Sequence, residues 1–171
     1  MSELFLDMLP ILSGKSNRID FDLVYTPDAD SIVSLSFADI SFPTPIKLVG
    51  YVKNMAGYMV LHTDVSLSYE TDCARCAEKV SAVLSFSFDK DIASGNVSPD
   101  NDDYIYITDK KLDLIEPVDE QLLMELPSRT LCRDDCLGLC PKCGKNLNLG
   151  KCSCETHEVD PRLAILKTLL K

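Results

Sequence analysis

The eight cysteines are the residues of this chain best suited to chemistry, and they fall into three clusters. Two thiolates separated by two residues can bind one tetrahedral ion with bonds of about 2.3 Å. In Cys140–Gly144 (CPKCG), the glycine lets the chain turn back and point amide N–H groups at sulfur. The clusters are Cys73 with Cys76, Cys132 with Cys136, and Cys140 with Cys143, Cys152 and Cys154.

Eight thiolates are enough for two sites of four ligands each. The last cluster predicts a local site, because its four cysteines close a short loop. The two earlier clusters then form a second site, which joins the turn after a predicted strand to the C-terminal segment. Such a long-range connection removes loop entropy from the unfolded chain. One site with four spare thiols is the alternative.

Zinc is the metal that this pattern favours. An iron site of the rubredoxin type uses two CPxCG segments, and this chain has one. A thioredoxin-like CxxC requires a βαβ context, whereas Cys73 and Cys76 lie between predicted antiparallel strands. Disulfides are disfavoured in the reducing cytosol, which is where we expect the protein. Sites filled by four protein ligands leave no position for water, so we expect them to be structural.

We expect no enzymatic activity and no small-molecule substrate. The chain has two histidines, and both are expected to be surface residues. His62 lies on the polar face of a predicted strand, and His157 is an outside candidate for a replacement metal ligand. The phosphate-binding loops, dinucleotide fingerprint and nucleophile elbow that mark common enzyme classes are missing from the sequence.

Charge divides the chain unevenly. Residues 1–128 contain 9 Lys or Arg against 22 Asp or Glu, a formal balance of −13, and residues 129–171 have a balance of +3. The acidic part suits a basic protein partner, because phosphate contacts require Lys or Arg. The alternative is that its charge serves only to keep the protein in solution. Any direct RNA contact is therefore expected from the C-terminal part. The candidate RNA-binding residues are Arg129, Arg133, Lys142, Lys145 and Lys151.

The segment 17–107 is typical of β-strands. Apolar side chains alternate with polar ones in several stretches, which indicates strands with one buried face. Ile46–Lys53 leads through a four-residue loop into the next stretch, which predicts a hairpin. The fold class predicted is α+β, mainly an antiparallel meander or partly closed barrel. The stretches are 21–25, 33–37, 46–53, 59–69, 80–88 and 104–107.

Two helices complete the expected architecture. The first is Leu114–Leu126, with Asp113 as a candidate cap and Pro117 making the starting residue ambiguous. The second begins at Pro161 after Asp160 and is expected to dock on the core by a stripe of leucines. We expect a β-rich domain over 1–128, ending in the acidic helix, and a zinc-binding tail over 129–171.

We expect a cytoplasmic protein without a membrane segment. No apolar run approaches the roughly 20 residues that a membrane helix requires. The N-terminal stretch carries Glu3 and Asp7 before the first basic residue, Lys15, whereas a secretory signal begins with a positive patch.

From Leu126 onward the sequence resembles the bacterial YceD-like family, whose members are described as large ribosomal RNA subunit accumulation proteins. The resemblance lies in Leu126–Pro127, the cysteine-rich segment 132–154 and the segment Asp160–Ala164. The Cys73–Cys76 element, which follows a predicted strand, and the acidic helix before Leu126–Pro127 also match. The resemblance implies a role in accumulation of large-subunit rRNA and no particular mechanism. The charge pattern predicts that the acidic surface binds a basic ribosomal protein, or that the basic C-terminal residues bind the rRNA.

Two other function classes remain open on the sequence. A redox or electron-transfer protein would contain iron or thiols that cycle. A zinc-ribbon accessory protein of transcription would associate with RNA polymerase in place of ribosomal particles.

Overall fold

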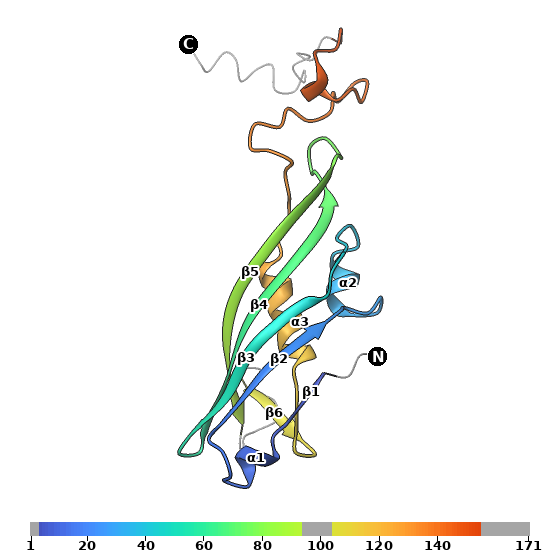
Figure 1. Ribbon diagram of the computed structural model, residues 1–171. Helices are drawn as coiled ribbons and strands as arrows, with labels where there is room; N and C mark the ends of the chain where they lie inside the picture. Colours follow the sequence, from blue (N-terminus) through green and yellow to red (C-terminus); the bar gives the residue numbers. More distant parts are fainter. Residues whose placement is uncertain (1–3, 94–103, 155–171) are drawn as a thin grey trace, which may run out of the picture. The chain divides into compact units, whose positions relative to one another are not determined.

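The computed structural model describes residues 4–93 and 104–154 (Figure 1). The chain forms two compact units. The first comprises Met1–Thr71 with Val80–Ser128, and the second comprises Asp72–Lys79 with Arg129–Lys171. The helix predicted to begin at Pro161 lies outside the described residues. Within the described residues, no helix has the length and apolar character needed to cross a membrane.

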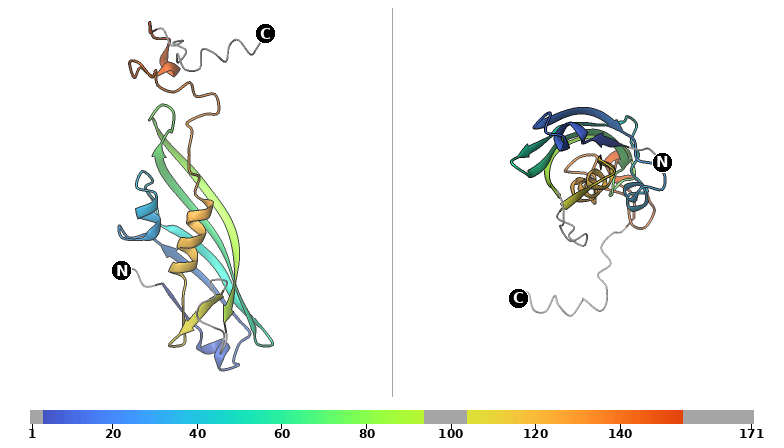
Figure 2. Two further views of the ribbon diagram at one scale, coloured as in Figure 1. Left: turned by 180° about the vertical axis from the view of Figure 1, so that it is seen from behind. Right: turned by 90° about the horizontal axis from the view of Figure 1, so that it is seen from below.

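A curled seven-stranded sheet forms most of the first unit, in the order β1-β7-β6-β5-β4-β3-β2. The pairs β2–β3, β3–β4, β1–β7 and β6–β7 are antiparallel, whereas β5 and β6 run parallel. The strands curve around helix α3 as a half-barrel (Figure 2). This confirms the predicted α+β class. The strands are β1 (Phe5–Asp7), β2 (Arg18–Tyr25), β3 (Ile46–Met55), β4 (Tyr58–Asp72), β5 (Lys79–Ala93), β6 (Tyr104–Thr108) and β7 (Lys111–Asp113).

Alternation along β4 supplies the centre of the core, as the sequence predicted. Every second side chain from Met59 to Tyr69 is buried, and the intervening ones are exposed or half-buried. One inward position is polar. The hydroxyl of Thr63 is buried, and its Oγ1 has no hydrogen-bond partner among the described residues. Thr63 lies opposite Gly50 of β3, where an added Cβ would clash with the His62 carbonyl oxygen.

The hairpin between β3 and β4 is confirmed, but its predicted four-residue loop is wrong. The ladder continues to the pair Met55–Tyr58, so only two residues form the turn. Ala56 and Gly57 both have positive φ, 57° and 99°. That conformation matches the right-handed twist of the flanking strands, which is why the pairing extends further than the sequence suggested.

The described helices are α1 (Leu9–Leu12), α2 (Ile32–Ser36), α3 (Ile115–Glu125) and a 3-10 turn, η1 (Leu147–Leu149). The strand predicted at 33–37 is wrong, because that segment is α2. The Ser31 side chain caps the helix by accepting a hydrogen bond from the Ser34 N–H. Val33 is fully buried while Leu35 is 71% exposed, so the short apolar alternation did not reflect a strand.

Helix α3 confirms the prediction for Leu114–Leu126. Pro117 lies in its first turn, where the missing N–H costs nothing. Val118 and Leu122 are buried in the core of the first unit. Asp119 is buried too, and its Oδ1 accepts a 2.7 Å hydrogen bond from the Tyr25 hydroxyl of β2. Burial raises the pKa of Asp119, outweighing this hydrogen bond, which lowers it.

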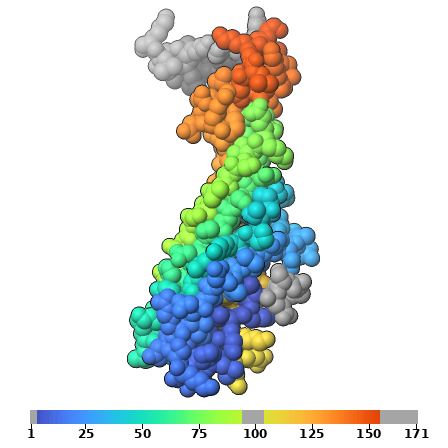
Figure 3. Space-filling model, in the orientation of Figure 1, coloured from blue at the N-terminus to red at the C-terminus, as the bar shows by residue number. Residues whose placement is uncertain are grey.

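Acidic side chains are exposed across β2 and β4 on one side of the sheet. The register aligns Asp22, Val49 and Asp64 in one row, and Asp20, Tyr51 and His62 in the next. We call the carboxylates of Asp20, Asp22 and Asp64 the acidic band. Lys47 approaches Asp22 at 3.5 Å, and Arg18 pairs with Asp20. Strands β2 to β5 appear blue to light green in the space-filling view (Figure 3).

Candidate metal centres

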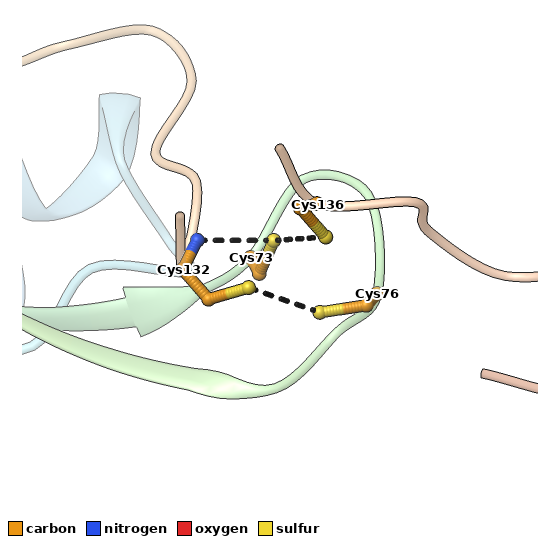
Figure 4. Close-up of side chains that lie close together, drawn as sticks. All are labelled: Cys73, Cys76, Cys132 and Cys136. Carbon is orange, nitrogen blue, oxygen red and sulfur yellow. Dashed lines mark hydrogen bonds between the residues drawn. The ribbon is translucent and has the colours of Figure 1, made fainter. Parts of the chain in front are cut away.

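The first group of cysteines, Cys73, Cys76, Cys132 and Cys136, lies in the second unit. Their side chains converge from the turn between β4 and β5 and from the segment after the first unit (Figure 4). All four sulfurs lie within 4.8 Å of one another. Cys73 Sγ is 3.9 Å from Cys136 Sγ, and Cys76 Sγ is 3.6 Å from Cys132 Sγ. The spacing of the sequence predicted this set.

These distances fit a tetrahedral metal site. Four sulfurs bound at about 2.3 Å around one ion lie about 3.8 Å apart along the edges of the tetrahedron. A disulfide would require a separation of about 2.05 Å, and all eight cysteines are free. Three of the four residues in the first group are buried, so the unpaired thiols have little access to water.

The second group contains Cys140, Cys143, Cys152 and Cys154, whose sulfurs also lie within 4.8 Å of one another. The described chain therefore brings together both predicted sets of four. Cys140 is buried, Cys143 is exposed and the other two are half-buried. His157, considered as a replacement ligand, lies outside the described residues. Each group offers four possible protein ligands, which is the number found in a closed structural site.

One knuckle geometry occurs in both groups. In the first group, Ala77 N donates to Cys73 O at 2.9 Å, and Cys73 N donates to Glu78 O at 2.8 Å. In the second, Gly144 N donates to Cys140 O at 2.8 Å, and Cys140 N donates to Lys145 O at 2.8 Å.

The residue after the second knuckle cysteine has positive φ in both, 57° for Ala77 and 71° for Gly144. The sequence indicated such a turn only at Gly144. Alanine conceals the same turn after Cys76.

Opposing influences move the thiol pKa values of the first group apart. Burial opposes ionisation of Cys73, but backbone N–H groups, beginning with that of Arg75, outweigh it and lower its pKa to about 6. At Cys76 the backbone hydrogen bond from Glu78 lowers the pKa, yet burial and the neighbouring thiols raise it to about 12. Four adjacent thiols cannot all ionise without a cation, because like charges repel.

The second group shows the same division. Backbone N–H groups of Cys143 and Lys142 lower the pKa of Cys140 to about 6. The Cys143 thiol and burial raise the pKa of Cys154 to about 12. A bound cation would take the place of the remaining protons, so we expect metal binding to release protons.

Two asparagines form hydrogen bonds at the first group, although the sequence did not mark them as functional. Asn148 Nδ2 donates to Cys136 Sγ at 3.3 Å, and this hydrogen bond lowers the pKa of the thiol. Asn146 Nδ2 donates to Glu78 Oε1 at 2.9 Å. Both asparagines lie between the ligands of the second group. Their position in the sequence therefore gave no sign of the group they contact.

The candidate RNA-binding residues are exposed, but several are held by contacts within the second unit. Arg133 donates to Asn148 Oδ1 at 2.7 Å and lies 3.3 Å from Asp135. Lys145 Nζ donates to the Lys151 carbonyl at 3.0 Å. Arg129 lines a shallow pocket of about 230 Å³ with Ala74, Arg75 and Leu131, and Lys142 is exposed beside Cys143. Arg133 and Lys145 are therefore already bound to other residues of the second unit.

Comparisons with known proteins give a consistent assignment. A model of the family described as "Large ribosomal RNA subunit accumulation protein YceD" matches residues 61–170. An uncharacterised protein of Mycobacterium tuberculosis is 33% identical over 162 residues, covering 92% of this chain and 77% of that protein. One of Mycobacterium leprae is 26% identical over 151 residues, covering 86% and 69%.

A chloroplastic protein of Arabidopsis thaliana, named as a homolog of the large ribosomal RNA subunit accumulation protein YCED, matches a shorter segment. It is 35% identical over 51 residues, which cover 30% of this chain and 16% of that protein. No solved structure matches the chain.

Proposed function

This chain belongs to the YceD family, described as large ribosomal RNA subunit accumulation proteins, and we propose that it is a zinc-binding, non-enzymatic factor for accumulation of large-subunit rRNA. The family description supports the biological role. The two groups of four cysteines are the observation that carries the proposed molecular role. Metal bound there would stabilise the fold, and the protein surface would then bind a partner.

Zinc suits both groups better than iron. The rubredoxin arrangement places two knuckles on one iron, whereas here each group has one knuckle and one pair of another spacing. Zinc has no redox chemistry and accepts four thiolates in a tetrahedron. Since each group already supplies four ligands, zinc would have no open position for a water molecule. The sites would therefore stabilise structure and leave function to the protein surface.

The charge of the zinc-loaded protein favours a basic protein partner over RNA. The first unit has a formal balance of −13, and the second unit has +3. Two zinc ions with eight thiolates contribute a further −4 to the second unit, which leaves it near −1. A surface without net positive charge has little attraction for a phosphate backbone. The acidic band offers carboxylates to lysine or arginine side chains of a large-subunit ribosomal protein.

Purification of the tagged protein at low salt tests the partner. We expect a basic large-subunit protein to remain bound after RNase treatment and to dissociate as salt rises, because charge attraction is screened. Reversing two charges of the acidic band, Asp22→Lys with Asp64→Lys, should abolish the association. The matched control, Asp30→Lys with Asp39→Lys, makes the same charge change around α2 and should retain most of it.

Three outcomes would contradict parts of the proposal. Release of the partner by RNase would identify RNA as the direct target. In that case Lys142→Ala with Lys151→Ala should weaken binding and flatten its salt dependence. Recovery of RNA polymerase in place of ribosomal particles would favour a transcription factor. A deletion strain with normal large-subunit rRNA would refute the assigned role.

A further inference from the structure

The loop of the second cysteine group provides a hydrogen bond to a ligand of the first. Asn148 lies in η1, between Cys143 and Cys152, and its Nδ2 donates to Cys136 Sγ at 3.3 Å. The Oδ1 of the same amide accepts the N–H of Leu137 at 2.8 Å. One side chain therefore holds both the last ligand of the first group and the residue that follows it.

Asn146 extends this connection. Its Oδ1 accepts the N–H of Asn148 at 2.9 Å, which caps η1 and fixes Asn148 in place. Its Nδ2 donates at 2.9 Å to Glu78, whose other carboxylate oxygen lies 3.7 Å from Cys76 Sγ. The two asparagines thus reach the first group at two different ligands.

The backbone joins the groups as well. Only the three residues 137–139 separate Cys136 from Cys140. Leu147 N donates to Gly138 O at 2.9 Å, and Leu139 N donates to Arg75 O at 3.0 Å. The connecting segment therefore lies between the knuckle of the first group and the loop of the second. A change in the order of that loop must reach the first group.

We propose that the two groups bind metal cooperatively, with Asn148 as the residue that positions Cys136 and transmits the coupling. This rests on the proposed metal binding and adds its regulation. Closure of the second group around an ion orders the loop 144–151 and brings Asn148 to Cys136. Outer-shell partners of this kind typically change metal affinity by about 10- to 100-fold. Linkage requires the effect to be equal in both directions.

The second group should fill first. Its ligands span only residues 140–154, so closing its loops costs little entropy. In the first group, the contact between Cys76 and Cys132 joins residues 56 positions apart. The first group therefore joins two segments distant in sequence, and the ordered Asn148 supports it only after the second group has closed.

Zinc affinities of the full chain, measured by competition with a chromophoric chelator, test the coupling. Cys140→Ser with Cys143→Ser removes the second group, and we expect zinc at the first to bind about 10- to 100-fold more weakly. Cys73→Ser with Cys76→Ser should weaken the second group by the same factor. Asn148→Ala should weaken the first group by a similar factor in the otherwise native chain. It should have little effect once the second group has been removed.

Leu149→Ala is the matched control, because Leu149 lies on the same turn and is 79% exposed. We expect it to leave both affinities unchanged. Cobalt(II) absorption provides a readout that overall unfolding does not imitate. Loss of the hydrogen bond to Cys136 Sγ should shift the thiolate-to-metal charge-transfer band of the first group in Asn148→Ala and leave that of the second unchanged.

The outcomes separate this inference from the proposed function. A wild-type chain that binds two zinc ions, with the first-group affinity unchanged by Asn148→Ala, refutes the coupling and leaves zinc binding intact. A wild-type chain without affinity for zinc refutes both. Where a cysteine variant fails to fold, an unchanged first-group affinity and cobalt spectrum in Asn148→Ala still refute the inference.

Discussion

Gly138→Ala should destabilise the second unit more than Gly144→Ala, although the two glycines have nearly the same φ. Gly138 has a φ of 75° and Gly144 one of 71°. An alanine Cβ at 138 would lie 3.0 Å from the Arg75 carbonyl oxygen and 3.4 Å from the Arg75 Cβ, whereas at 144 it would meet no atom of the described residues within 4 Å. The pair therefore separates the backbone cost from the steric one.

The expected magnitudes follow from these contacts. An L-residue with positive φ costs about 1–2 kcal/mol, and loss of glycine freedom in the unfolded chain returns about 0.4–1 kcal/mol. Gly144→Ala should therefore cost about 1 kcal/mol. Gly138→Ala must also displace the Arg75 carbonyl, which accepts the N–H of Leu139. Weakening that bond adds about 1 kcal/mol, for a total of about 2 kcal/mol.

Zinc affinity is the suitable assay, because folding of a small metal-stabilised segment and metal binding share one free energy. We expect an affinity loss of about 5-fold for Gly144→Ala and about 30-fold for Gly138→Ala. Ala77→Gly, at the equivalent knuckle position with φ 57°, should tighten binding by about 5-fold. Equal losses at 138 and 144 would show that the contact with Arg75 carries no energy, and the reasoning would fail.

Three further predictions concern the core, the pH response and the metal. Thr63→Val should stabilise the first unit by about 1 kcal/mol in urea unfolding, because it removes a buried hydroxyl that has no hydrogen-bond partner among the described residues. Destabilisation would show that the hydroxyl forms a hydrogen bond. Because the pKa of Asp119 is raised in the folded protein, stability should fall as pH rises from about 4 through that raised pKa. Asp119→Asn should flatten this slope, and an unchanged slope would contradict the assignment. Cys143→Ser or chelation should increase amide exchange across 132–154, and unaltered exchange there would show that metal does not order the segment.

The fold was predictable where one periodicity extended over many residues. Eleven residues of alternation from Met59 to Tyr69 were enough to identify β4 and its buried face. The short alternation at 33–37 was ambiguous, and the cap at Ser31 selects a helix there. The parallel pairing of β6 with β5 depends on contacts distant in sequence, which no local pattern reveals.

The candidate site was predictable to the level of its ligands. Cysteine spacing indicated both sets of four, because the reach of the chain between neighbouring thiols is short. The environment of the thiols was not predictable. Asn148 belongs by sequence to one group and by contact to the other. Ala77 has the conformation that glycine usually marks. Both depend on how the two segments of the second unit fold together.

In the sequence, Cys76 precedes much of the first unit and Cys132 follows it, so the two thiols are synthesised at different times. The residues between them, 77–131, include β5, β6, β7 and α3. A ribosome adds about 5–20 residues per second, so Cys76 emerges roughly 3–11 seconds before Cys132. The last strands of the sheet are thus available for pairing before the first group can assemble. That group can therefore form only after every strand of the sheet has been translated.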